Sequence, residues 1–91
     1  MTNYEAIWRV LADLITELRG GGELLPSHVM KDLRSAKTTM QILKVDRNNL
    51  DHISRIEEFL GNVECYVMYA AQRTLGAKAF DSWVDRLKDA R

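Results

Sequence analysis

The 91-residue sequence is poor in the features that mark secreted, membrane-bound and nucleic-acid-binding proteins. It has a single cysteine, Cys65, which excludes an internal disulfide and is typical of a reducing compartment. No apolar stretch approaches the roughly 20 residues of a membrane span, and Glu5 and Arg9 interrupt the uncharged run that a signal peptide needs. Thirteen basic residues balance thirteen acidic ones, so no net charge attracts nucleic acid or anionic lipid. We therefore expect a cytoplasmic protein with no membrane partner.

What the sequence has in abundance is apolar residues at helical spacing. Apolar residues make up 46% of the chain and charged residues 29%, which is typical of a globular domain. In four segments they recur at steps of three and four, and the alternation typical of strands is absent. The four stripes are Tyr4, Ile7, Leu11, Leu14 and Leu18; Val29, Leu33, Ala36, Met40 and Leu43; Ile53, Ile56, Leu60, Val63, Val67 and Ala70; and Phe80, Trp83, Val84 and Leu87.

Residues that favour helix starts precede three of these stripes. Thr2 and Glu5 have the spacing of a capping box, in which a hydroxyl and a carboxylate satisfy free backbone N–H groups. Pro26 suits a helix entrance, with Ser27 beside it as a candidate cap. Asn48 or Asn49 is the expected N-cap of the third helix.

Glycines mark two of the predicted ends. The three consecutive glycines at 20–22 end the first helix, and Gly76 is expected to stop the third after Leu75. The second helix is predicted to run to about Lys44. Because the connections are short, we predict that residues 1–91 form one all-α domain. Its expected architecture is an up-and-down antiparallel bundle of four helices, three long and one short and C-terminal.

The chain resembles the N-terminal helical domain of a family of uncharacterised archaeal proteins, found mainly in methanogens. The stretches that carry the resemblance are Tyr4 to Arg19, Asp32 to Thr38, Ile56 to Glu64 and Phe80 to Leu87, so all four predicted helices take part. The resemblance implies archaeal origin, a helical fold and a second small domain after the position of Arg91. It implies no activity.

Few side chains are spaced for metal binding or nucleophilic catalysis. Neither His28 nor His52 has a Glu three residues before it, as helical metal sites require. Cys65 has no second cysteine with which to share a zinc ion, and we expect it to be an inert, packed thiol among apolar neighbours. We therefore expect no cofactor, no metal site and no enzymatic activity.

Two patterns nevertheless resemble those of enzymes. Arg47 and His52 have the Arg-x4-His spacing, with Asn second, of a superfamily of small all-helical ribonucleases and nucleotide-binding proteins, in which His acts as base and Arg stabilises charge. Among thirteen basic residues such a spacing is a common accident, and Arg47 falls in a predicted turn. Four carboxylates resemble the magnesium ligands of all-α nucleotide pyrophosphatases, although a solvated acidic face is the favoured interpretation: Glu57, Glu58, Asp81 and Asp85.

A basic stripe on the second helix is the candidate nucleic-acid surface. From residue 31 to residue 47 five basic residues stand against two acidic ones: Lys31, Arg34, Lys37, Lys44 and Arg47. Phosphate-binding surfaces have this composition, but no aromatic residue interleaves with the stripe to stack bases. An RNA-associated role is therefore the alternative, and a solvated helix face is the favoured interpretation.

The residues from Val63 to Ala71 are more apolar than one packed helix face needs, since only Glu64 among them is polar. Either other helices surround this half of the third helix, or a second molecule covers it. Met and Tyr are enriched at interfaces, and glycine permits close approach of another backbone. We therefore predict a protein–protein interaction module that forms a homodimer, with an unknown further protein partner. The predicted interface consists of Gly61, Tyr66, Met68 and Tyr69.

Overall fold

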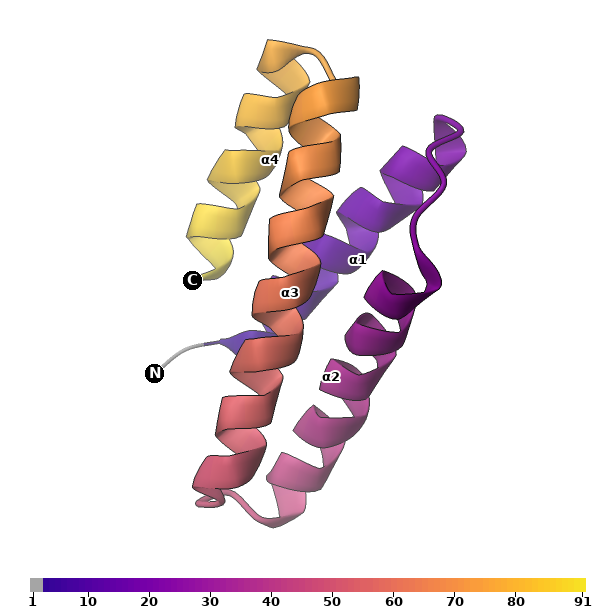
Figure 1. Cartoon of the computed structure of the whole chain (residues 1–91). Coiled ribbons are helices and arrows are strands. Elements are labelled where there is room, and N and C mark those ends of the chain that lie inside the picture. The colour runs from indigo at the N-terminus through magenta and orange to yellow at the C-terminus, as the bar shows by residue number, and fades with distance from the viewer. Residues whose placement is uncertain (1–2) are drawn as a thin grey trace.

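Four helices follow one another in the computed structural model, which describes residues 3–91 (Figure 1). They are α1 (Tyr4–Gly20), α2 (Ser27–Val45), α3 (Leu50–Thr74) and α4 (Ala77–Ala90). Successive helices run in alternating directions, and α4 is the shortest. The predicted all-α up-and-down bundle of four helices is therefore confirmed.

The helix starts follow the capping rules, although not always at the expected residue. The side chain of Asn3 accepts a hydrogen bond of 3.0 Å from the Ala6 N–H and so caps α1, whereas the predicted cap, Thr2, lies outside the described residues. Asn49 caps α3 as expected and accepts from the His52 N–H at 3.2 Å. The prediction for Ser27 was wrong, because it is the first helical residue of α2 and its side chain makes no capping bond.

The predicted stop of α3 at Gly76 is confirmed in position, but Gly76 is not in the left-handed conformation typical of glycines that end helices. Helix α3 ends at Thr74, its C-cap is Leu75 in an extended conformation, and Gly76 is instead the N-cap of α4 with φ of −65°. Among the described glycines only Gly22 has a positive φ, +92°, which a side chain rarely adopts. The sharp turn that requires glycine therefore lies after α1 and not between α3 and α4.

One hydrophobic core joins the four helices. All of its buried side chains except Ile15 and Ala71 come from the predicted stripes, which each present one side of a helix to the others. The core consists of Ile7, Leu11, Leu14, Ile15, Leu18, Val29, Leu33, Ala36, Ile56, Leu60, Val63, Val67, Ala70, Ala71, Trp83 and Leu87.

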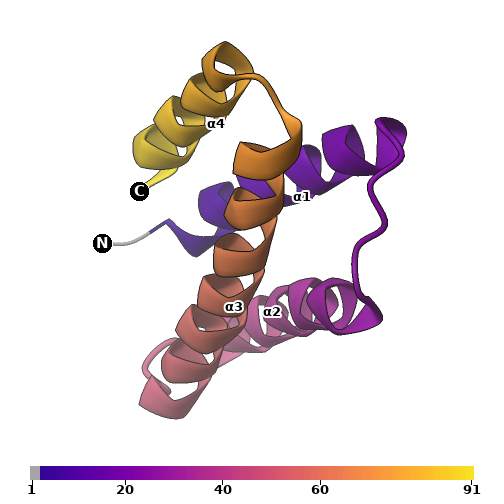
Figure 2. The same cartoon turned by 45° about the horizontal axis from the view of Figure 1, so that its top comes forward.

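The helices are not equivalent in this packing. Helices α2 and α3 lie side by side, while α1 crosses behind α3 obliquely (Figures 1 and 2). Helix α1 contacts α2, α3 and α4, and α3 likewise contacts the other three. Over residues 3–91, α2 and α4 make no contact with each other, so they lie on different sides of the α1–α3 pair.

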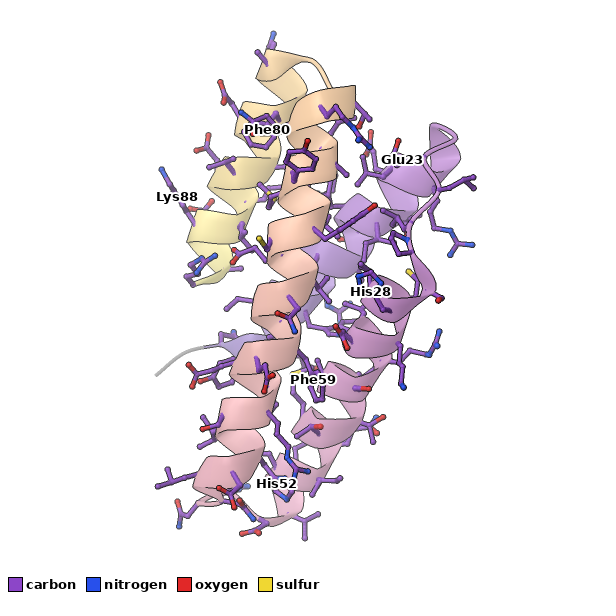
Figure 3. The ribbon with its side chains drawn as sticks, viewed as in Figure 1. Glu23, His28, His52, Phe59, Phe80 and Lys88 are labelled. Atoms are coloured by element: carbon purple, nitrogen blue, oxygen red, sulfur yellow. The ribbon has the colours of Figure 1, made fainter. Side chains whose placement is uncertain are left out.

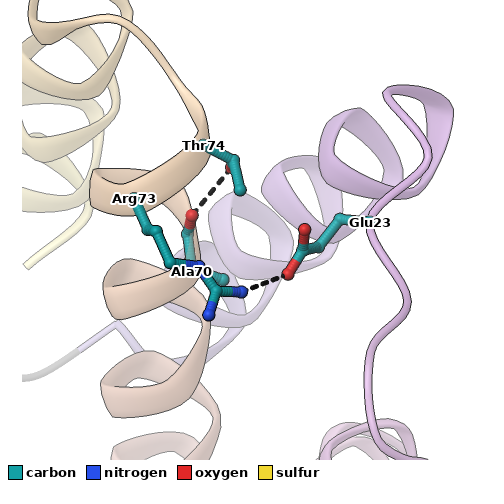
Figure 4. Close-up of polar contacts among 4 residues, drawn as sticks. All are labelled: Glu23, Ala70, Arg73 and Thr74. Carbon is teal, nitrogen blue, oxygen red and sulfur yellow. Dashed lines mark hydrogen bonds and ion pairs between the residues drawn. The ribbon is translucent and has the colours of Figure 1, made fainter.

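Ion pairs at the surface connect the later helices to the rest of the bundle. Arg86 on α4 pairs with Asp13 on α1 at 3.1 Å, and Arg91 pairs with Glu64 on α3. Arg73 near the end of α3 pairs at 2.7 Å with Glu23, in the segment that follows α1 (Figure 4). Exposed pairs each contribute about 0–1 kcal/mol, so burial of Trp83 and Leu87 accounts for most of the attachment of α4.

Replacement of Leu11 or Leu33 with Asp should unfold the domain. The two side chains are 0% and 6% exposed, so each substitution places an unpaired charge in the core and adds to the about 2–5 kcal/mol that a Leu→Ala cavity costs. Domains have only about 5–15 kcal/mol of stability to lose. Thermal melting followed by circular dichroism checks this, with Leu24→Asp as the control because Leu24 is 91% exposed. Core variants that melt within a degree or two of wild type would refute the core assignment.

Candidate interaction surfaces

The predicted interface residues lie on three different sides of α3. Tyr66 is half-buried, and its ring meets that of His28 at the start of α2 edge to face, with centroids 6.2 Å apart. Met68 is half-buried in a groove of about 330 Å³ between α3 and α4, whose other apolar lining is Val84 and Leu87. Tyr69 is 64% exposed.

Helix geometry explains this separation. Two consecutive steps turn an α-helix by about 200°, so Tyr66 and Met68 cannot share one face. The outward face between them carries Gly61, Cys65 and Tyr69, all exposed. A Cβ atom added to Gly61 would meet nothing within 4 Å, although Gly61 also lines a groove of about 300 Å³ whose other walls include Tyr4 and Ile7 of α1 and Arg91. The structure therefore brings Gly61 and Tyr69 onto one open face, with Tyr66 and Met68 at its two edges.

The prediction that Cys65 is packed was wrong, because this thiol is exposed. Val63, Val67, Ala70 and Ala71 are the buried members of the apolar stretch, since the other three helices all pack against their side of α3. Cys65 lies on the opposite side of the helix. Burial within the chain thus accounts for part of the apolar character of the stretch, whereas Cys65 and Tyr69 are exposed.

The five cationic side chains of the predicted stripe are all exposed, and within residues 3–91 none of them takes part in an ion pair. Lys37 and Lys44 line a groove of about 130 Å³ between α2 and α1, together with Trp8 and Arg9. Lys31 and Arg34 line a groove of about 350 Å³ between α2 and α3, which also includes Arg55 and Phe59. Arg47 lies in the turn after α2.

The absence of aromatic residues from the stripe holds for the sequence but not for the folded surface. Trp8 reaches one groove from α1 and Phe59 reaches the other from α3, and Figure 3 shows Phe59 between α3 and α2. Arg9 and Arg55 were missed for the same reason, because they come from helices far from the stripe in sequence. Only the pairing of the helices could have indicated them.

The structure does not bring the residues of the two enzyme-like patterns together into a site. His52 is half-buried in the first turn of α3 with its Nδ1 buried and unbonded, and Arg47 is exposed in the preceding turn. Glu57 accepts a hydrogen bond of 3.0 Å from the Tyr4 hydroxyl, while Glu58 faces solvent. Asp81 and Asp85 are exposed on α4. Over residues 3–91 no three His, Cys, Asp or Glu side chains form a group that could hold a metal ion.

Sequence reasoning missed an exposed apolar group at the turn between α2 and α3. Ile42, Val45 and Leu50 are 46%, 91% and 75% exposed, respectively. Each falls off the buried stripe of its helix, which is the signal that could have identified them. These three residues are a second set of candidate contact residues, near the turn between α2 and α3.

Substitution of His52 or Arg47 with Ala should leave any cleavage of RNA by the purified protein unchanged. Arg47 lies in the turn before α3 and His52 lies in the first turn of that helix, and no hydrogen bond joins their side chains within residues 3–91. They therefore do not form an acid–base pair. Gel analysis of a labelled single-stranded RNA after incubation with each variant tests this. A specific product that wild type forms and His52→Ala does not form would establish a ribonuclease site.

None of the helices in residues 3–91 combines the length and apolar character needed to cross a bilayer.

Comparisons with known proteins agree with the four-helix architecture. No curated protein and no solved structure matches the chain. One family model matches residues 4–91, the DUF2096 N-terminal four-helical bundle domain. Because the match extends over all four helices, the chain belongs to the family defined by the DUF2096 N-terminal four-helical bundle domain.

Proposed function

We propose that this domain is a non-enzymatic helical interaction module that self-associates through the outer face of α3. The observation that carries the proposal is the open face formed by Gly61, Cys65 and Tyr69, on a helix that is covered by other helices on its opposite side. Tyr69 is 64% exposed, and tyrosine is one of the residue types enriched at protein–protein interfaces. A second copy of the chain is the proposed occupant.

Two-fold symmetry supplies a specific register for this contact. If two α3 helices cross antiparallel with Cys65 at the axis, Gly61 of one copy lies opposite the partner subunit's Tyr69, because both are four residues from Cys65. The missing side chain at Gly61 leaves room for the partner's phenol ring. Each interface then contains this Gly–Tyr contact twice.

The edges of the face support the same arrangement. Met68 lines the apolar groove between α3 and α4, where a side chain of the partner can be buried. Glu58 is exposed on the outer side of α3, and the antiparallel register places it near the partner's Arg73, whose guanidinium lies 5.7 Å from the Tyr69 ring of its own chain. Opposite charges at an interface rim favour one orientation over its reverse.

The proposal extends to the setting of the protein. An exposed free thiol persists in a reducing compartment, which supports the predicted cytoplasmic location. Archaeal origin stays a prediction from the resemblance described above.

Cross-linking through Cys65 should trap the homodimer. Since Cys65 is the only cysteine, mild oxidation joins two chains only where two copies of this residue meet. We expect a covalent dimer for wild type and much less for Tyr69→Glu or Met68→Glu, while Val45→Glu, at a 91% exposed position on the other candidate surface, is the matched control. Light scattering after size exclusion gives the mass of each variant. A monomeric wild type refutes the dimer, and a dimer that only Val45→Glu disrupts places the interface at the α2–α3 turn.

Substitution of Gly61 with Leu should separate folding from association. In the single chain the added Cβ atom meets nothing within 4 Å and the substitution removes a helix penalty of about 1 kcal/mol, so the monomer should melt at a higher temperature. In the proposed dimer it collides with the partner's Tyr69 and should weaken association. Dilution series by light scattering and thermal melting measure the two effects. A Gly61→Leu variant that dimerises as strongly as wild type would contradict the register.

A further inference from the structure

The charges of this neutral chain are unevenly distributed among the helices. Helix α2 carries four cationic side chains and one carboxylate, whereas each of the other three helices carries at least as many acidic as basic residues. The three ion pairs within residues 3–91 use Arg73, Arg86 and Arg91. The cations of α2 therefore take part in none of these ion pairs and can contact an external anion. A surface with unpaired cations and few carboxylates attracts a polyanion.

The cations of α2 connect the two grooves beside that helix. Residues spaced three apart form a row inclined to the helix axis, so the line through Lys31, Arg34 and Lys37 crosses α2 from the α3 side toward the α1 side. Lys31 and Arg34 line the groove beside α3, and Lys37 and Lys44 line the groove beside α1. Rise along the helix separates Lys31 from Lys44 by about 20 Å, which is room for several phosphates.

Each groove holds one aromatic ring and one additional arginine. The Trp8 Nε1–H donates to the Leu33 carbonyl at 2.7 Å, which fixes the indole against α2, and the Lys37 Nζ lies 4.9 Å from the ring centroid. In the other groove Phe59 is half-buried beside Arg55. Aromatic rings beside a track of cations are the elements from which single-strand binding surfaces are built, since bases stack on the rings while phosphates contact the cations.

We propose that this face of the domain binds single-stranded nucleic acid, with phosphates along the α2 stripe and bases at the Trp8 and Phe59 grooves. A duplex is a poorer ligand because its bases are already stacked on one another. The recognising chemistry is shared by RNA and single-stranded DNA, and nothing in the grooves selects a 2′-hydroxyl. This surface belongs to α2 and its two neighbours and does not include the outer face of α3.

Fluorescence anisotropy with labelled oligouridylate and oligodeoxythymidylate of about twelve nucleotides tests the proposal. If about four phosphates are contacted, affinity should fall roughly fiftyfold between about 50 and 200 mM salt, because each contact releases counterions. The two oligonucleotides should bind within about threefold of each other, and a blunt duplex should bind more weakly. Absence of binding at the lower salt concentration, or equal binding of the duplex, would overturn the proposal.

Substitutions of equal charge distinguish the site from a general effect of net charge. The pair Lys37→Glu and Lys44→Glu should reduce affinity more than about tenfold and lower the salt dependence by about 1.4 in slope, as loss of two contacts requires. The matched pair Arg19→Glu and Lys78→Glu, at exposed positions on α1 and α4, makes the same change in net charge and should alter affinity less than about threefold. Equal losses in the two pairs would overturn the site.

The aromatic contribution is tested separately. Phe59→Leu keeps an apolar side chain and should reduce affinity for the single strand by roughly tenfold through loss of stacking, with no change in salt dependence. Circular dichroism confirms that the variant is folded. Poly-glutamate serves as the competitor that carries charge without bases, and if it displaces the oligonucleotide as well as unlabelled oligouridylate does, base stacking is not used and the proposal fails.

Discussion

Burial of one side of α1 against all three other helices is the interaction on which the rest of the structure depends. The buried side chains of α1 are Ile7, Leu11, Leu14, Ile15 and Leu18. Because α2 and α4 have no contact with each other over residues 3–91, they are held in one body only through α1 and α3 (Figure 2). Because α1 crosses behind α3 obliquely, it contacts α2 on one side of α3 and α4 on the other. A change in the core side of α1 therefore affects its packing against α2, α3 and α4 at once, whereas each exposed ion pair contributes only about 0–1 kcal/mol.

The two candidate surfaces follow from this arrangement. Helix α3 contacts three helices through the side that contains Val63 and Val67, so its opposite side with Cys65 and Tyr69 is left open. Helix α2 contacts only α1 and α3, and its free side carries the basic residues. The proposed ligands differ accordingly: a polyanion for the basic residues of α2, and a second copy of the chain for the face of α3 that carries Gly61, Cys65 and Tyr69. Association through the face of α3 would leave the basic side of α2 open, so the two proposals are compatible with each other.

Much of the fold could be predicted from the sequence, because helix periods and ends are local properties. The stripes, the glycine turn after α1 and the Asn49 cap were all confirmed. The sites were harder, because they depend on which helices are neighbours. The period of α3 gives the buried side of the helix but not how far its neighbours extend around it, so Cys65 was expected to be packed and is exposed. Trp8 and Phe59 lie beside the basic stripe only after three helices have packed together.

Self-association of the folded domain is the central claim, and small-angle X-ray scattering over a dilution series tests it most directly. The single chain has a Cα radius of gyration of 13.4 Å, so the most dilute samples should approach this value and concentrated samples should rise well above it with a doubled forward-scattering mass. Tyr69→Glu should shift the rise to higher concentration. A radius close to 13.4 Å and the mass of one chain at every concentration would contradict the account.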